Sequence, residues 1–163
     1  MIYFVSDTHF NHNNIIKYCN RPFNDVNEMN ETMINNWNSI VTNEDIVYHL
    51  GDFCLSSDEE IKNIFNKLNG TKILIRGNHD RKPVKFYEEV GFKVLTHAPI
   101  VLDEYKLMLS HVPLPDTKIK DGYINLHGHV HNKKIDNIYS EKKHINLSVD
   151  VINFKPISLD DIK

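Results

Sequence analysis

The stretch IVYHLGD, residues 46–52, joins a short apolar run directly to Gly51-Asp52. An apolar run of this length is too short for a helix and fits a buried β-strand, residues 46–50, that ends in a loop. Two other segments share the pattern: IYFV at residues 2–5 precedes SDTHFNHNN, and KILIR at residues 72–76 precedes GNHD. Each predicted strand therefore ends next to polar side chains that can bind metal.

Helical patterns lie between these strands. The first follows Asp25, a residue type that caps helices, and places Glu28 three positions later, with apolar side chains at helical spacing beyond it. Alternation of strand and helix predicts parallel βαβ units in the first half of the chain. The expected helices cover residues 25–41, 57–68 and 83–90.

The second half consists mainly of strand-like segments separated by turns, which predicts antiparallel hairpins on a neighbouring or facing sheet. We see no internal repeat and no linker, and 163 residues suffice for one core but not for an added cap. We therefore expect one α/β domain spanning residues 1–163, without a cap domain. The expected strands of this half cover residues 93–95, 98–102, 105–110, 123–127, 144–147 and 149–152.

Composition narrows the function classes. A formal net charge of −3 argues against a non-specific nucleic-acid binder, whose affinity comes from clustered lysine and arginine. The chain has two cysteines, and its N-terminus turns polar after MIYFV, which is too early for a signal peptide. No apolar run approaches the length of a membrane span. We expect a reduced, cytoplasmic protein with no membrane partner; the sequence leaves its oligomeric state open.

Metal-capable residues follow almost every expected strand. The carboxyl ends of strands in an open α/β fold are where ligands bind, so residues far apart in the sequence can meet in one crevice there. Carboxylates, an asparagine and several imidazoles, without a thiolate, suit divalent Mn, Fe, Zn, Ni or Co and are too rich in nitrogen for Ca or Mg alone. The residues are Asp7, His9, Asp52, Asn78, His79, Asp80, His111, His127, His129 and His131.

Such a set also suggests a reaction. Two carboxylates cannot neutralise two dications, so the site keeps positive charge and attracts an anion such as phosphate. Between two metal ions, a bridging water becomes hydroxide near neutral pH and can attack a phosphoryl group whose oxygens both ions polarise.

Five short motifs, in this order along the chain, resemble those of the calcineurin-like metallophosphoesterase superfamily. Each is weak alone, but all five follow predicted strands. The start of the chain, SDTHFNHNNII, and the late NLSVDV are similar to a narrower group of small bacterial and phage members. The five motifs are Asp7-x-His9, Gly51-Asp52, Gly77-Asn78-His79-Asp80, Ser110-His111 and Gly128-His129-x-His131.

The resemblance implies a two-sheet sandwich, with two facing mixed sheets flanked by helices, and it implies a role for each residue. His79 would stay outside the metal shell, stabilise the attacked phosphoryl group and help protonate the leaving oxygen, while Asp80 would orient and charge that imidazole. Asp52 would bridge two divalent metal ions. Asp7, His9 and His131 would complete the first metal site, and Asn78, His111 and His129 the second.

Residues outside the motifs are more ambiguous. Arg81 follows the GNHD loop and could contact a substrate phosphate or form a surface ion pair. Asn11 and His12 could contact substrate or cap a helix that begins near Asn13. His49 and His127 are expected in the core or behind the ligands, and Asp150 in a turn or at the surface.

The leading hypothesis is hydrolysis of a phosphomonoester or phosphodiester, as a phosphatase or phosphodiesterase, with a small nucleotide-type diester as the partner molecule. A metal-dependent nuclease is the alternative within the enzyme class, so nucleic acid stays open as a partner. The competing class is a non-catalytic metal-binding interaction scaffold of the same fold. Loops 11–25 and 113–122 are expected to determine the substrate.

Overall fold

The computed structural model describes residues 1–95, 99–135 and 139–162. Its first sheet has the strand order β4-β3-β2-β1-β9, with β1 at Ile2–Val5, β2 at Ile46–His49, β3 at Thr71–Ile75, β4 at Lys93–Leu95 and β9 at Ile157–Ser158. Strands β1 to β4 are parallel, and β9 pairs antiparallel to β1. The predicted βαβ units of the first half are confirmed, because helices connect these parallel strands.

The helices begin where the sequence placed their caps. The Asp25 carboxylate accepts a hydrogen bond from the Glu28 amide at 2.9 Å, and Ser57 and Glu60 form a reciprocal capping box. Gly91 ends its helix with φ at 120°, a conformation that a side chain disfavours. The helices are α1 (Asn13–Tyr18), α2 (Val26–Asn38), α3 (Asp58–Lys67), α4 (Val84–Val90) and α5 (Leu159–Ile162).

The second sheet has the order β5-β6-β7-β8, with β5 at Ile100–Leu102, β6 at Leu107–Leu109, β7 at Ile124–His127 and β8 at His144–Asn146. Only the β5–β6 pair is antiparallel, whereas β6–β7 and β7–β8 are parallel. The expectation of hairpins throughout this half is therefore wrong for these two pairs. Residues 110–123 and 128–143 are long enough for parallel crossovers, although no α-helix in their described parts marks them in the sequence.

One expected strand, residues 149–152, is instead a 3₁₀ turn, η4 (Val149–Val151). Val149 and Ile152, three residues apart, are both buried while Val151 is exposed, as a three-residue repeat requires. The expected strand 98–102 is a strand from Ile100 onward, and residue 98 lies outside the described residues. Three further 3₁₀ turns are η1 (Asp103–Tyr105), η2 (Asp116–Lys118) and η3 (Glu141–Lys143).

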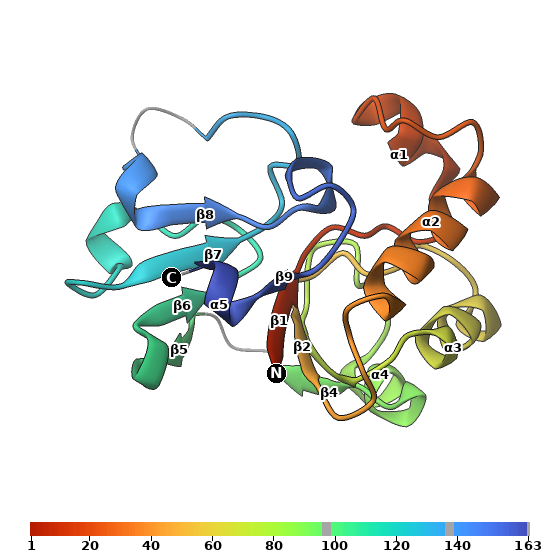
Figure 1. Cartoon of the computed structure of the whole chain (residues 1–163), viewed down its shortest axis with the longest axis horizontal. Coiled ribbons are helices and arrows are strands. Elements are labelled where there is room, and N and C mark those ends of the chain that lie inside the picture. The colour runs from red at the N-terminus through yellow and green to blue at the C-terminus, as the bar shows by residue number, and fades with distance from the viewer. Residues whose placement is uncertain (96–98, 136–138, 163) are drawn as a thin grey trace.

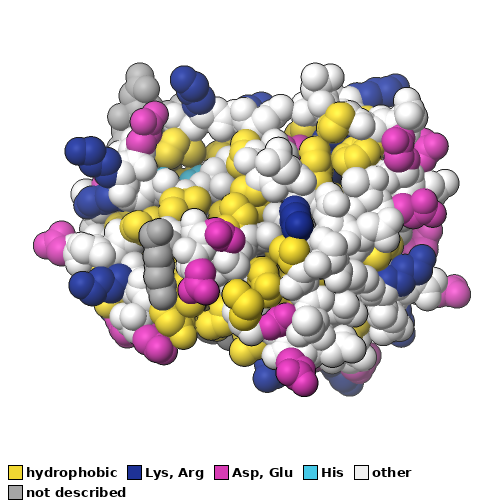
Figure 2. All heavy atoms as spheres, viewed as in Figure 1, with side chains coloured by type: hydrophobic (Ala, Val, Ile, Leu, Met, Phe, Trp, Pro, Cys, Tyr) yellow, Lys and Arg dark blue, Asp and Glu magenta, His cyan; other side chains and the backbone are white. Residues whose placement is uncertain are grey.

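The elements are arranged in layers. Helices α2, α3 and α4 lie on one side of the first sheet and the second sheet lies on the other (Figure 1). Met29, Met33 and Trp37 form the buried face of α2. Hydrophobic side chains gather near the middle of the face shown in Figure 2, and charged side chains of both signs lie around its edge. In the described ranges, no helix is long and apolar enough to cross a membrane.

Replacing Asp25 with Ala should lower the free energy of unfolding by about 1 kcal/mol, because the Glu28 amide loses its acceptor. Urea denaturation measures this difference. Asn24→Ala is the matched control, since Asn24 is exposed and contributes its backbone amide, which the substitution keeps. Equal loss of stability in the two variants would contradict the assigned cap.

Candidate metal centre

The loops that follow β1, β2, β3, β6 and β7 converge at one edge of the two sheets. Their polar side chains meet there because parallel strands present their carboxyl ends together. Each of the seven predicted ligands has a donor atom within 3.9 Å of a donor atom of another. They are Asp7, His9, Asp52, Asn78, His111, His129 and His131.

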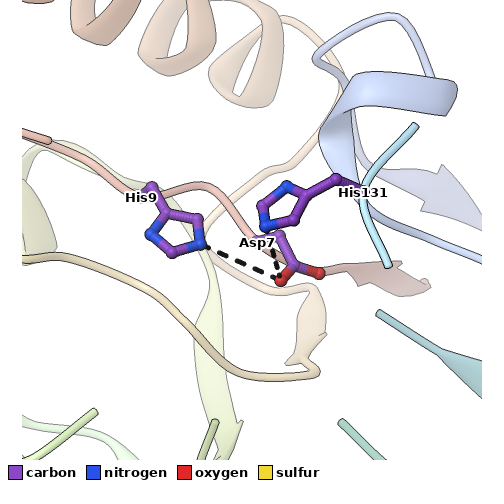
Figure 3. Close-up of side chains that lie close together, drawn as sticks. All are labelled: Asp7, His9 and His131. Carbon is purple, nitrogen blue, oxygen red and sulfur yellow. Dashed lines mark ion pairs between the residues drawn. The ribbon is translucent and has the colours of Figure 1, made fainter. Parts of the chain in front are cut away.

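Asp7, His9 and His131 form the first group. The Nε2 atoms of His9 and His131 lie 3.9 and 3.8 Å from the same carboxylate oxygen, Oδ1 of Asp7. Both imidazoles point toward that oxygen (Figure 3). Among the described residues, Asp7 Oδ1 and both ring nitrogens of His9 are buried without a hydrogen-bond partner. Unpaired buried acceptors are costly, so this arrangement fits a bound cation.

Asn78, His111 and His129 form the second group. Oδ1 of Asn78 lies 2.9 Å from His111 Nε2 and 3.1 Å from His129 Nδ1, and the two ring nitrogens are 3.2 Å apart. Ligands held at about 2.0–2.2 Å from one ion lie about 3.0–3.6 Å from each other. The spacing in this group therefore suits one metal ion.

Asp52 lies between the two groups. Its Oδ2 atom is 3.4 Å from Nε2 of His9 and 3.5 Å from Nε2 of His111. Burial acts to raise the pKa of Asp52, but the His111 and His9 imidazoles and the His79 amide outweigh it and hold the pKa well below its usual range. The carboxylate is therefore charged at neutral pH and can be shared by two cations.

Hydrogen bonds on the far side of two imidazoles fix which nitrogen is available. Nδ1 of His111 donates to the Leu50 carbonyl at 2.8 Å, and Nδ1 of His131 donates to Asp150 at 2.8 Å. When either ring gives up its second proton to bind a cation, the lone pair is therefore on Nε2, which faces the candidate site. This use of a carbonyl or carboxylate behind the ring is typical of metal-binding histidines.

Backbone conformation also brings the ligands together. Asp7, His9, Asp52, His129 and His131 all have φ between 48° and 70°, a left-handed conformation that is rare for residues with a side chain. Such conformations cost about 1–3 kcal/mol each and persist only where the surrounding structure enforces them. Their concentration at one point marks a functional site.

Two motif glycines allow the loops to approach each other. A Cβ atom on Gly77 would lie 2.2 Å from Asp52 Oδ1, and one on Gly128 would lie 2.1 Å from Asp7 Oδ2. The glycines therefore make room for the carboxylates of Asp7 and Asp52, two of the candidate ligands.

Asp80 connects two loops of the site. Its carboxylate accepts hydrogen bonds from the amides of Asp52, Phe53 and Gly77 at 2.7, 3.0 and 2.8 Å. Burial raises its pKa to about 6 although these amides act to lower it. We expected this carboxylate to orient the His79 imidazole; the structure instead directs it to the backbone, so its role is to hold the loop that carries Asp52.

Arg21 and Asp150 form a support that the sequence did not reveal. The two side chains are buried, and Nε and Nη2 of Arg21 bond both carboxylate oxygens of Asp150 at 2.8 and 3.1 Å. Arg21 also donates to the carbonyls of Asp7 and Thr8. Burial acts to lower the pKa of His131, but Asp150 outweighs it and raises the pKa to about 10. Asp150 was expected in a turn or at the surface; it lies in the turn η4, but its side chain is buried behind the candidate ligand His131.

His49 supports the same loops from inside the core. Burial lowers its pKa to about 3, so the ring is neutral. Nδ1 accepts from the Gly51 amide at 3.2 Å, so Nε2 carries the proton and donates to Thr8 at 2.9 Å. The Thr8 hydroxyl in turn donates a hydrogen bond to the Phe53 carbonyl at 2.7 Å. The expected place of His49 behind the ligands is confirmed.

Some of the remaining predicted site residues line a pocket beside the ligand groups, and others do not. His79 and His12 line a pocket of about 630 Å³ together with His9, His129 and His131. Asn11 points elsewhere, because its side-chain oxygen accepts from Asn30 on α2 at 2.5 Å.

Arg81 and His127 are not among the residues that line that pocket. Arg81 is exposed, with Nε 3.5 Å from the Asn78 carbonyl, and a phosphate contact stays a prediction. His12 occupies the first position before α1 but forms no capping hydrogen bond with its side chain. His127 is buried, with Nδ1 3.0 Å from the Gly128 carbonyl, as expected of a core residue.

Comparison with known proteins supports this picture. A family model described as calcineurin-like phosphoesterase matches residues 1–158. An uncharacterized protein of Methanocaldococcus jannaschii is 48% identical over 98% of this chain and 87% of its own. The gene 66 protein of Mycobacterium phage L5 is 28% identical over 98% of this chain and 91% of its own.

Two solved structures are similar. A protein of unknown function from Aquifex aeolicus superimposes with a TM-score of 0.77 and 31% identity, covering 99% of this chain and 97% of that one. The Pseudomonas putida nuclease MPE superimposes with a TM-score of 0.55 and 22% identity, covering 80% of this chain and 61% of that one, which shows a shared fold.

Adding Mn²⁺ or Zn²⁺ after chelation should raise the melting temperature, because a cation relieves the repulsion among unpaired acceptors. At about 100 times the dissociation constant the gain is about 2.7 kcal/mol, or about 5–10 °C for a chain of this size. Differential scanning calorimetry measures the shift. Gly128→Ala should abolish it, because the new Cβ collides with Asp7, whereas Gly122→Ala should keep it, because nothing lies within 4 Å there. An equal shift in both variants would refute the assignment.

Asp150→Asn should weaken binding of the metal ion held by His131 by about 10- to 100-fold, the usual effect of losing a carboxylate behind a histidine ligand. Titration calorimetry measures the affinity. Asp116→Asn is the matched control, because Asp116 pairs with His144, which is not a candidate ligand. The distance between His144 Nε2 and Asp116 Oδ1 is 3.0 Å. Breaking the buried Arg21 pair should also lower the free energy of unfolding by about 3 kcal/mol, so binding is compared at a temperature where both variants are folded. Unchanged affinity would show that Asp150 has only a structural role.

Proposed function

The chain belongs to the calcineurin-like phosphoesterase family, and we propose that it hydrolyses phosphoric mono- or diesters at a dinuclear metal centre. The observation that carries this proposal is the position of Asp52 Oδ2, nearly equidistant from an imidazole of each ligand group. Two groups of donors that share one carboxylate suit two ions rather than one. Candidate metals are Mn, Fe, Zn and Ni, because the donors are oxygen and imidazole nitrogen.

Two bound cations would supply activated water as the nucleophile and neutralise charge on the phosphoryl oxygens. The residues of the chain do the rest. Asp7, His9 and His131 would hold one cation, and Asn78, His111 and His129 the other. The buried hydrogen bonds of Asp52 and Asp80 limit the movement of the loops that carry the ligands. Little reorganisation of these loops is therefore needed when substrate binds.

His79 is the proposed catalytic acid. It lines the pocket, its ring centroid lies 5.3 Å from that of His9, and its amide donates to Asp52 Oδ1 at 2.8 Å. In the proposed reaction a P–O bond forms to the water oxygen and the ester P–O bond breaks. His79 would stabilise the phosphoryl group and give a proton to the leaving oxygen. Asp80 would act through the loop rather than on the imidazole.

Two candidate functions of this site differ in their substrate. A small nucleotide-type diester is the first, and nucleic acid is the second, since the similar fold of the Pseudomonas putida protein belongs to a nuclease. Against a non-catalytic scaffold stand the complete ligand set and the presence of His79 beside it. One hydrophobic core includes residues of both sheets, which supports a single domain over residues 1–163 without a cap.

Wild-type protein loaded with Mn²⁺, Ni²⁺ or Zn²⁺ should hydrolyse p-nitrophenyl phosphate or bis-p-nitrophenyl phosphate. His79→Ala should lower kcat by about 10²- to 10⁴-fold, as expected for loss of a general acid, while metal content stays unchanged. Asp52→Asn should lower both activity and metal content. Release of p-nitrophenolate and elemental analysis provide the two readouts.

Asp103→Asn is the control for these substitutions, because Asp103 is exposed and pairs with Lys120 at the surface. A wild-type protein inactive on both esters with every metal would contradict the hydrolase proposal. Full activity in Asp52→Asn would contradict the ligand assignment.

A further inference from the structure

The pocket above the metal centre is larger than a phosphoryl group needs. Its volume of about 630 Å³ lies within the range of pockets that hold whole small molecules. Histidines of the proposed centre form one part of its lining. The rest comes from α1 and Cys19, from residues 112–113 and 130–135, and from Tyr139. The substrate should therefore carry further groups that these walls contact.

The α1 wall is aromatic. Rings follow one another outward from the ligand His9: its centroid lies 5.5 Å from that of His12, which lies 6.2 Å from that of Tyr18. Tyr18 lines the pocket and is 70% exposed, so its ring is accessible to a ligand. An exposed aromatic ring beside a phosphoester site is a suitable surface for stacking a planar base.

Another part of the lining carries positive charge. Lys133 and Lys134 line the same pocket and are exposed, although the chain as a whole has a net charge of −3. The Asn132 amide nitrogen donates to the Cys19 carbonyl at 2.9 Å, which ties this loop to the end of α1. The lysines thus line the pocket from a loop that is tied to the end of α1, where a second phosphate of the substrate can reach them.

We propose, on the basis of the proposed hydrolase function, that the substrate is a single-stranded oligonucleotide. One base stacks on Tyr18 and His12, the scissile phosphate lies at the metal centre, and a neighbouring phosphate contacts Lys133 and Lys134. Only a strand with unpaired bases can stack in this way, because the base face is covered in a duplex.

Two esters with the same leaving group test the base contact. Thymidine 5′-(p-nitrophenyl phosphate) and methyl p-nitrophenyl phosphate differ only in the nucleoside. The wild-type protein should prefer the nucleoside ester in kcat/KM. Tyr18→Ala should reduce that preference by about 10-fold, and Tyr18→Phe should keep it, because stacking needs the ring and not the hydroxyl.

Tyr123→Ala is the control, since the Tyr123 hydroxyl bonds Asp103 at the surface and not in this pocket. Hydrolysis of both esters without a nucleoside preference, or a preference that Tyr18→Ala leaves intact, would overturn the base contact while the hydrolase function stands.

A binding measurement without turnover tests the phosphate contact. Fluorescence anisotropy with a labelled oligothymidylate, in EDTA to prevent cleavage, should show tighter binding than thymidine 5′-monophosphate achieves as competitor. Changing Lys133 and Lys134 together to Gln should weaken oligothymidylate binding several-fold and flatten its salt dependence. The matched control changes Lys142 and Lys143 of η3 to Gln and should leave both unchanged.

Equal affinity for the oligonucleotide and the mononucleotide would overturn the neighbouring-phosphate contact. Binding that depends on Tyr18 and the two lysines, in a protein that hydrolyses neither ester, would support the oligonucleotide site and refute the hydrolase. Absence of both binding and hydrolysis would overturn both proposals.

Discussion

The buried carboxylate of Asp80 is the contact on which the metal centre depends. It gathers three amides from the loops after β2 and β3 and so fixes the distance between them. Asp52 then reaches back, and its Oδ1 accepts from the His79 amide. Two loops that are separate in the sequence become one rigid unit, with the proposed bridging oxygen at its centre. A polar group in the interior is stable only when all its hydrogen bonds are made, and here they are made to the backbone that needs positioning.

The buried guanidinium of Arg21 also holds a loop of the site in place, the loop after β1. Arg21 joins the carbonyls after β1 to Asp150, and Asp150 holds the ring of His131. Because the guanidinium is planar and its hydrogen bonds are directional, Arg21 fixes the orientation of the Asp150 carboxylate as well as attracting it. The candidate ligands Asp7 and His131 are thus held in place by the buried ion pair of Arg21 and Asp150. Such support allows several residues to keep a left-handed backbone that would otherwise relax.

The strand pattern of the first half and the positions of the candidate ligands could be predicted from the sequence. Residues such as Asp7 and Asn78 directly follow short apolar strands, so the strand pattern places them at one edge. The partners of Asp80 and the burial of Asp150 could not be predicted, because both depend on contacts between distant segments. The run SVDVI fits a strand as well as a turn until its tertiary surroundings are known. The parallel pairing of β6, β7 and β8 was missed because the described parts of their crossovers hold no α-helix to reveal them.

The order of these contacts along the chain has a consequence for synthesis. Strand β1, which leads to Asp7 and His9, leaves the ribosome well before its neighbour β9 and before Asp150, the partner of His131. A nascent chain therefore exposes carboxylates and imidazoles without the geometry that would bind an ion tightly. The candidate ligands and their supports can take up this arrangement only after Asp150 and β9 have left the ribosome, so the proposed centre would capture metal after their synthesis.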